Sequence, residues 1–311
     1  MKLAMVFPGQ GSQSVGMLKG YDGLPGVDAV RSAAAGALGA DFLKLLDEGP
    51  AEQLNLTVNT QPAMVAAAIA AYRGWLGAGG PAPALVAGHS LGEYSALVAA
   101  GALALEAALP LVRFRAQSMQ QAVPEGQGAM AAILGLDDEA ARAACAEAAQ
   151  GEVVQAVNFN APGQVVIAGH KSAVARAIEA CKARGAKRAM PLPVSAPFHS
   201  SLMQPAALKL GGYLKDVALS SPVIPVLNNV DVKEEKDPIK IKDALVRQAA
   251  SPVRWAETIR AMAAQGVTHV VECGPGKVLA GLVKRIEPTL QGFAAADRAS
   301  LEQALAAVKG G

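Results

Sequence analysis

Aromatic residues and cysteines are both scarce in this sequence of 311 residues. Phe, Trp and Tyr together make up 4% of it, and only three cysteines are present, at positions 145, 181 and 273. The three cysteines are far apart and form no CxxC pair, which argues against a disulfide framework and against a thiolate metal site. We therefore predict no metal site, and a reducing cytoplasm fits this cysteine usage best.

Charge and long hydrophobic runs are also limited. Charged residues make up 17%, and 28 basic against 26 acidic residues give a net charge of +2. So small a charge provides no general field for nucleic acid or anionic lipid. The longest apolar stretch, 96–105, is well short of the ~20 residues of a membrane-spanning helix. We expect a cytoplasmic monomer with no nucleic-acid or membrane partner.

What the sequence has in quantity is apolar residues, at 52%, arranged as alternating strands and helices. Segments 3–7 and 83–88 read as buried parallel strands, and 91–103 reads as a helix that directly follows the second strand. Helices are predicted over 27–46 and from Pro62 to 76. Further strands are predicted at 223–227 and 267–272, and a further helix at 278–285. This alternation predicts an α/β fold with a parallel sheet covered on both faces.

A different pattern begins near residue 126. It predicts strands at 129–134, 153–158, 164–168 and 188–193, with helices at 137–149 and 172–184, the second of which has Ser172 as N-cap. The order β-α-β-β-α-β is that of the ferredoxin-like, split βαβ arrangement. We predict an inserted small subdomain at 126–194 within a large α/β-hydrolase-like catalytic domain formed by 1–125 and 195–311.

The strongest chemical motif is Gly88-His89-Ser90-Leu91-Gly92, which fits the G-x-S-x-G nucleophile elbow. It lies between a predicted strand and a predicted helix, where a tight turn would expose the Ser90 hydroxyl at the carboxyl end of the sheet. The helix N-terminus behind it would offer the Leu91 N–H to a developing oxyanion. The alternative is a glycine-rich loop in which Ser90 only caps a helix.

A serine hydroxyl needs a base to act as nucleophile, and the chain has four histidines. His89 is next to Ser90 and is expected to be structural, while His170 and His269 fit surface or core positions better. His199 lies in the loop 197–201 and follows the serine in chain order, so it is the best base. No acidic residue of the large domain lies in a suitable loop between Ser90 and His199. A backbone or side-chain carbonyl could orient the imidazole instead, which would make the pair a dyad.

Several segments together resemble the motif series of malonyl-CoA:acyl carrier protein transacylases, in the right order across nearly the whole chain. The segments are FPGQGSQ (7–13), GHSLGEYSA (88–96), VRFRAQSM (112–119), NFNAPGQVV (158–166), APFHS (196–200), QAASPVRW (248–255) and ECGPGKVL (272–279).

The resemblance implies roles for particular residues. Ser90 matches the nucleophile and His199 the general base, whose ring is held by the main-chain carbonyl of Gln248. Gln10 and Leu91 match the two backbone N–H donors of the oxyanion hole.

The resemblance also implies how the acyl group is recognised. Arg115 matches the arginine that binds the free malonyl carboxylate, a role that suits the planar, permanently charged guanidinium. Without the family, Arg115 would read as an ordinary surface arginine on a helix. Phe198 matches a position that excludes an α-methyl group, and Asn160 and Val278 match residues that line the cleft.

The activity implied is malonyl transfer from malonyl-CoA, through malonyl-Ser90, to the phosphopantetheine thiol of acyl carrier protein for fatty-acid synthesis. No cofactor is expected, because CoA is part of the substrate and phosphopantetheine belongs to the partner. Acyl carrier proteins are acidic, so one or both of two basic clusters are expected to dock the carrier. The clusters are Lys182, Arg184, Lys187 and Arg188, and Lys277, Lys284 and Arg285.

Three other functions are compatible with parts of the sequence. A serine hydrolase would share the elbow and the base but would not need Arg115. A dinucleotide-binding protein is suggested by Gly9-Gln10-Gly11 after the first strand, although Ser14 stands where a third Gly or Ala is expected. A non-catalytic scaffold that binds the carrier would keep its function without the Ser90 hydroxyl.

Overall fold

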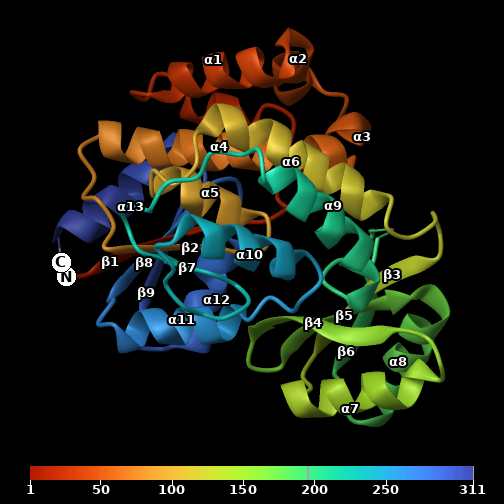
Figure 1. The fold of residues 1–311 in the computed structure, drawn as a ribbon. Helices are drawn as coiled ribbons and strands as arrows, with labels where there is room; N and C mark the ends of the chain where they lie inside the picture. The colour runs from red at the N-terminus through yellow and green to blue at the C-terminus, as the bar shows by residue number, and fades with distance from the viewer. Residues whose placement is uncertain (195, 311) are drawn as a thin grey trace.

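The computed structural model describes residues 1–194 and 196–310, and it contains two separate β-sheets (Figure 1). The larger sheet has five strands in the order β7-β2-β1-β8-β9, and every neighbouring pair is parallel. The strands are β1 (Leu3–Phe7), β2 (Leu85–Gly88), β7 (Val226–Leu227), β8 (His269–Cys273) and β9 (Gln291–Ala295). The predicted parallel sheet is confirmed.

Helices cover both faces of this sheet, as Figure 1 shows. One face carries α4 (Thr57–Gly77), α5 (Gly92–Ala99) and α6 (Leu105–Gln120), and the other carries α11 (Trp255–Ala264) and α12 (Val278–Ile286). The central strand β1 therefore has both faces buried, with Met5 and Phe7 in one core and Ala4 and Val6 in the other. This explains why the strand reads as an unbroken apolar run.

The remaining helices of the large-sheet part extend the first core or close the sheet edges. They are α1 (Val27–Leu38), α2 (Ala40–Glu48), α3 (Ala51–Leu54), α9 (Gln204–Leu214), α10 (Pro238–Ala249) and α13 (Arg298–Gly310). Two short 3-10 helices accompany them, at Met17–Tyr21 and Ser201–Met203.

The smaller sheet is antiparallel and has the order β4-β5-β3-β6. Its strands are β3 (Gly128–Leu134), β4 (Val154–Ala161), β5 (Gln164–His170) and β6 (Arg188–Pro191). Helices α7 (Asp138–Ala149) and α8 (Lys171–Ala183) pack on one face and close a separate core. The predicted β-α-β-β-α-β subdomain is confirmed as a fold. All four strands lie inside the predicted range 126–194; residue 195, the predicted return point, and Gly311 lie outside the described residues.

Some predicted elements have different limits in the structure. The single helix predicted over 27–46 is two helices, because Gly39 between them adopts φ 89°. The helix predicted from Pro62 begins at Thr57, with Pro62 inside it. The helix predicted to reach 103 ends at Ala99, just before Gly101 at φ 70°. Such positive-φ glycines are typical helix stops.

Two smaller predictions also need correction. Ser172 does not cap α8; the N-cap is His170, and the Ser172 hydroxyl donates to the Glu152 carboxylate instead. The strand predicted at 223–227 is reduced to Val226–Leu227. Proline at 225 has no N–H to donate to a neighbouring strand, which is consistent with the strand beginning only at Val226. The Pro225 carbonyl still accepts the Val86 N–H.

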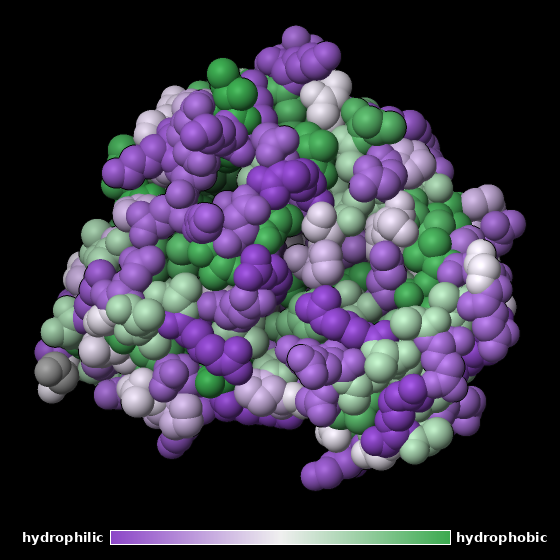
Figure 2. Space-filling model, turned by 60° about the horizontal axis from the view of Figure 1, so that its bottom comes forward, coloured by the Kyte–Doolittle hydropathy of each residue, from purple (hydrophilic) through white to green (hydrophobic). Residues whose placement is uncertain are grey.

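The surface is mixed in character. Figure 2 shows hydrophilic and hydrophobic residues interspersed over the face that it presents. Within residues 1–194 and 196–310, no helix combines the length and the apolar character needed to cross a membrane.

Candidate active site

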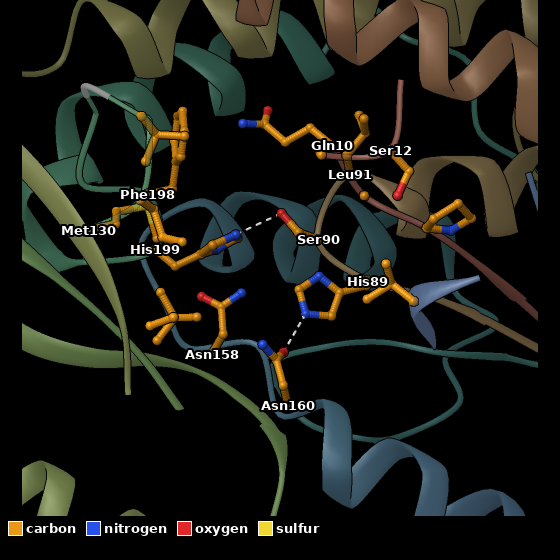
Figure 3. A pocket seen from close by; sticks show the side chains of 18 of the residues that line it. Gln10, Ser12, His89, Ser90, Leu91, Met130, Asn158, Asn160, Phe198 and His199 are labelled. Atoms are coloured by element: carbon orange, nitrogen blue, oxygen red, sulfur yellow. Dashed lines mark hydrogen bonds between the residues drawn. The ribbon is translucent and has the colours of Figure 1, made fainter. Parts of the chain in front are cut away.

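A cavity of about 390 Å³ lies where the two sheets meet. The large-sheet side contributes the segments after β1 and β2, including Gln10 and Ser90, and the small sheet contributes Met130, Asn158 and Asn160. Figure 3 shows these side chains facing a common space. In parallel α/β sheets, ligands bind outside the carboxyl ends of the strands, and this cavity has that position.

Ser90 lies on a sharp turn between β2 and α5. Its φ of 51° is in the left-handed region, which is rare for a residue with a side chain. A Cβ on Gly88 would lie 1.9 Å from the Gly92 carbonyl carbon, and one on Gly92 would lie 2.1 Å from the Phe7 oxygen. Both flanking positions therefore require glycine, as the nucleophile-elbow interpretation predicts.

His199 brings its ring to the Ser90 hydroxyl. Its Nε2 lies 2.7 Å from Ser90 Oγ (Figure 3). Its Nδ1 lies 2.9 Å from the Gln248 carbonyl oxygen. The carbonyl accepts a proton only from Nδ1–H, so Nε2 is left as an acceptor for the serine proton. Burial, and next the Arg115 charge, lower the pKa of His199 to about 3. The ring is therefore neutral at pH 7 and able to take a proton.

Arg115 is buried, at 2% exposure, on α6. Its Nη1 donates to Gln61 Oε1 at 2.9 Å, and its Nη2 donates to Gln248 Oε1 at 3.0 Å and to Ser90 Oγ at 3.2 Å. The ion pairs within residues 1–194 and 196–310 do not include it. The alternative of an ordinary surface arginine is wrong. A buried guanidinium without a bound carboxylate beside the nucleophile is suited to an anionic substrate.

Sequence reasoning missed Gln61, Glu93 and the side chain of Gln248. The buried Glu93 carboxylate accepts the Gln248 Nε2–H at 2.9 Å, and burial raises the pKa of Glu93 to about 7. Gln248 thus contacts Arg115 through its side chain and His199 through its main chain. Of these residues, only Gln61 has a signal in the sequence: it is a lone polar amide at the start of a long alanine-rich run.

Gln10 and Leu91 line the cavity beside Ser90, above it in the view of Figure 3. In the part of the chain that the structure describes, neither backbone N–H donates to a protein acceptor. Leu91 also forms the N-cap position of α5, so its amide points out of a helix N-terminus. Two free N–H groups beside a nucleophile are what an oxyanion hole requires, and the oxyanion role of Gln10 and Leu91 remains a prediction.

Asn160 and His89 form a pair on the small-sheet side of the cavity. The Asn160 Oδ1 lies 2.8 Å from His89 Nε2, and burial lowers the pKa of His89 (Figure 3). The other two histidines are away from the cavity: His170 caps α8, and His269 is buried in β8. Phe198 and Val278 also line the cavity.

Metal binding finds no support in the described residues, where no three His, Cys, Asp or Glu side chains are grouped to hold an ion. The prediction that no metal or cofactor is used remains a prediction.

Comparisons with known proteins agree with this geometry. A family profile for the acyl transferase domain matches residues 4–300. Malonyl CoA-acyl carrier protein transacylase of Escherichia coli K12 is 56% identical over 98% of this chain and 99% of the relative. That of Bacillus subtilis 168 is 45% identical over 99% and 98%. This chain belongs to the malonyl-CoA:acyl carrier protein transacylase family.

Solved structures of this transacylase family have the same fold. The acyl-carrier-protein S-malonyltransferase of Burkholderia pseudomallei 1710b superposes with a TM-score of 0.96 at 62% identity, covering 98% of this chain and 99% of that one. A malonyl-transacylase in complex with a type II polyketide acyl-carrier protein gives 0.95 at 54% identity, with the same coverages.

The dinucleotide-binding alternative fails on the structure as well as on the family. The loop after β1 lines the active-site cavity, and only a 3-10 helix, Met17–Tyr21, follows it. A dinucleotide motif needs an α-helix that begins within the glycine-rich turn. This transacylase has no such helix after Gly11.

Proposed function

We propose that this chain transfers malonyl groups from malonyl-CoA to the phosphopantetheine thiol of acyl carrier protein, supplying fatty-acid synthesis in the cytoplasm. The observation that carries the proposal is that Ser90 Oγ lies within hydrogen-bond distance of both His199 Nε2 and Arg115 Nη2. The first contact activates a nucleophile. The second places a buried cation where the far carboxylate of a malonyl thioester would lie. The free state of all three cysteines supports a reducing compartment.

The first half-reaction follows from these contacts. As the Ser90 oxygen forms a bond with the thioester carbon, His199 Nε2 takes the hydroxyl proton. The negative oxygen of the tetrahedral intermediate receives the Gln10 and Leu91 N–H groups. The C–S bond then breaks, CoA leaves as a thiol with the proton from His199, and malonyl-Ser90 remains.

The second half-reaction reverses these steps with the carrier thiol. His199 takes the thiol proton, the sulfur attacks the serine ester, and the Ser90 oxygen recovers the proton as it leaves. The Gln248 carbonyl stabilises the imidazolium in both halves, which is the orienting role of the acid in a serine triad. The reaction is therefore ping-pong.

Arg115 separates a malonyl transferase from a simple serine hydrolase. A bidentate guanidinium–carboxylate contact would fix the malonyl group in one orientation and favour it over a neutral acyl group. Phe198, which lines the same cavity, is proposed to restrict an α-methyl substituent. A hydrophobic contact of that kind discriminates by only about 1–3 kcal/mol.

The carrier is proposed to dock over α12. Val278, Leu279 and Leu282 of this helix line the cavity, and Lys284 and Arg285 lie in its last turn, with Lys277 at its N-cap. Two cations of the other cluster are already paired, Lys182 with Glu179 and Arg184 with Glu147. An acidic carrier at α12 would have a short path for its prosthetic arm to Ser90.

The direct test is mass spectrometry of the protein mixed with malonyl-CoA, before and after addition of holo carrier protein. A stable malonyl adduct on Ser90 that is discharged to the carrier supports the proposal. Steady CoA release without an adduct, or an adduct lost equally fast without the carrier, would identify a hydrolase instead. Transfer by Ser90→Ala at the full rate would identify a scaffold.

A further inference from the structure

Asn229 lies against the nucleophile turn although it is far from Ser90 in the sequence. It follows β7 by two residues, and β7 pairs in parallel with β2, with Leu227 opposite Ala87. The register therefore places Asn229 beside the turn that begins after Gly88. The side chain is completely buried, with 0% exposure, and nothing in the sequence motif series includes it.

The side-chain amide of Asn229 holds two consecutive peptide groups of that turn. Its Oδ1 accepts the Ser90 N–H at 2.7 Å, and its Nδ2 donates to the Gly88 carbonyl at 2.7 Å. Only a planar amide offers an acceptor and a donor side by side for this purpose. A carboxylate or a hydroxyl of similar reach could satisfy only one of the two contacts well.

The backbone of Asn229 connects the same turn to the base. Its N–H donates to Glu93 Oε2 at 2.9 Å, and that oxygen also accepts from Gln248 Nε2. The main-chain carbonyl of Gln248 in turn holds the His199 ring. The Asn229 carbonyl accepts the Arg254 N–H, so all the polar groups of Asn229 have partners.

The turn needs such support because of its backbone conformation. Ser90 has a φ of 51°, and a non-glycine residue remains in this region only when its surroundings determine it more strongly than its own preference. The two Asn229 hydrogen bonds hold the peptide groups on both sides of His89, directly before Ser90, and meet that requirement. A group displaced by about 1 Å from its reacting partner can slow a reaction about 100-fold.

We propose that Asn229 is a positioning residue for transacylation: it fixes the strained Ser90 turn and ties it through Glu93 and Gln248 to the base. This inference rests on the proposed function. It acts on the acylation step and not on the binding of malonyl-CoA, because Asn229 has no contact with the cavity.

The test compares Asn229→Ala with Asn228→Ala in the full chain. Asn228 is the neighbouring buried asparagine, and its Oδ1 accepts the Asp231 N–H without contacting Ser90. Single-turnover formation of malonyl-Ser90 is followed over a range of malonyl-CoA concentrations, which separates the limiting rate from the half-saturating concentration. Thermal melting reports how much each variant loses in stability.

We expect Asn229→Ala to lower the limiting acylation rate about 100-fold and to change the half-saturating concentration by no more than about 3-fold. Asn228→Ala is expected to stay within about 3-fold of the parent in both. Equal rate losses in the two variants, or a loss confined to the half-saturating concentration, would overturn the proposal. If Asn229→Ala does not fold, Asn229→Asp replaces it, because it keeps the size and the acceptor for the Ser90 N–H but loses the donor to Gly88.

A crystal structure of the same Asn229 variant decides the question independently of activity. The inference requires Ser90 to leave the left-handed region or its Oγ to leave His199 Nε2, and an unchanged Ser90 refutes it. If the unsubstituted chain forms no malonyl adduct at all, the proposed function fails. The geometry of Ser90 in the variant would then still show whether Asn229 holds the turn.

Discussion

The parallel and antiparallel sheets line the same cavity, but the polar groups on the two sides are held differently. On the parallel-sheet side, Ser90, His199 and Arg115 are joined by hydrogen bonds to one another or to Gln248. On the antiparallel side, the Asn160 side chain has one hydrogen bond, with His89, and the buried Asn158 Oδ1 accepts none within the described residues. The proposed chemistry therefore uses the side with the denser hydrogen-bond network, and the other side has fewer bonds within the protein.

The largest expected loss of acylation rate comes from removing the base on the parallel-sheet side. His199→Ala should lower the rate of malonyl-Ser90 formation about 10²- to 10⁴-fold, because the serine proton then has no acceptor. His170→Ala is the matched control: it removes a histidine from the antiparallel part that lies outside the cavity. Quench-flow mass spectrometry measures the adduct. A similar loss in both variants would contradict the role given to His199.

The next largest effect is expected at the carboxylate clamp. Arg115→Ala should reduce the preference for malonyl-CoA over acetyl-CoA about 10- to 150-fold, the equivalent of ~1.5–3 kcal/mol for a hydrogen bond to a charged group. Arg113→Ala removes a neighbouring arginine of α6 that lies over the Phe42 ring and not in the cavity. Competition between the two acyl-CoAs for Ser90 gives the ratio directly. An unchanged ratio would exclude the clamp.

The same pair of variants makes a prediction about pH. The Arg115 charge is the second cause, after burial, that lowers the pKa of His199 to about 3. Removing that cation favours the protonated ring, so the pKa rises. Since the base works as neutral imidazole, the acid limb of kcat/KM for acetyl-Ser90 formation should move to higher pH in Arg115→Ala but not in Arg113→Ala. If the acid limb of kcat/KM does not move in Arg115→Ala, the Arg115 charge does not influence the pKa of His199.

A smaller effect is expected on the antiparallel side. Asn160→Ala should raise the KM for malonyl-CoA by about 10-fold or less, in line with one neutral hydrogen bond of about 0.5–1.5 kcal/mol, and leave kcat nearly unchanged. Gln155→Ala on the same strand loses a bond to the Ser201 N–H outside the cavity. Steady-state kinetics with saturating carrier protein distinguish the two. If kcat of Asn160→Ala falls as far as that of His199→Ala, the antiparallel side takes part in the chemistry as much as the parallel side does.

The smallest effect is expected at the carrier surface. Lys284→Glu on α12 should raise the KM for the carrier a few-fold and weaken its salt dependence, because rim charges act mainly on the association rate. Malonyl loading should be unaffected. Lys182→Glu, at the alternative cluster, serves as the matched charge reversal. If it has the larger effect, the carrier docks on α8 and not on α12.

Local sequence signals predicted the elements around the nucleophile well. The apolar run before Gly88, the two glycines and the helix after them specify the elbow through neighbouring residues alone. The β-α-β-β-α-β order of the antiparallel part is equally local, because each strand pairs with others within about 65 residues of the chain.

The rest of the site depends on contacts that the sequence does not encode locally. Arg115 reads as a surface residue on a helix, but it is buried among residues distant in the sequence, in contact with Gln61 of α4 and Gln248 of α10. Gln248 and Glu93 belong to helices α10 and α5 and meet only when β2 and the chain after β7 lie side by side. Family resemblance supplied Arg115 and the Gln248 carbonyl, while the side-chain network needed the structure.

Both reacting residues have a backbone that a side chain disfavours, Ser90 at φ 51° and His199 at φ 65°. Glycine adopts such angles without the ~1–2 kcal/mol that other residues lose. Stability and turnover therefore conflict at Ser90, where glycine would relieve the backbone strain and remove only a hydroxymethyl group, whereas glycine at the buried His199 would leave a cavity. Directed evolution that selects for a higher melting temperature alone should enrich glycine at position 90, and the enriched clones would be stable but inactive.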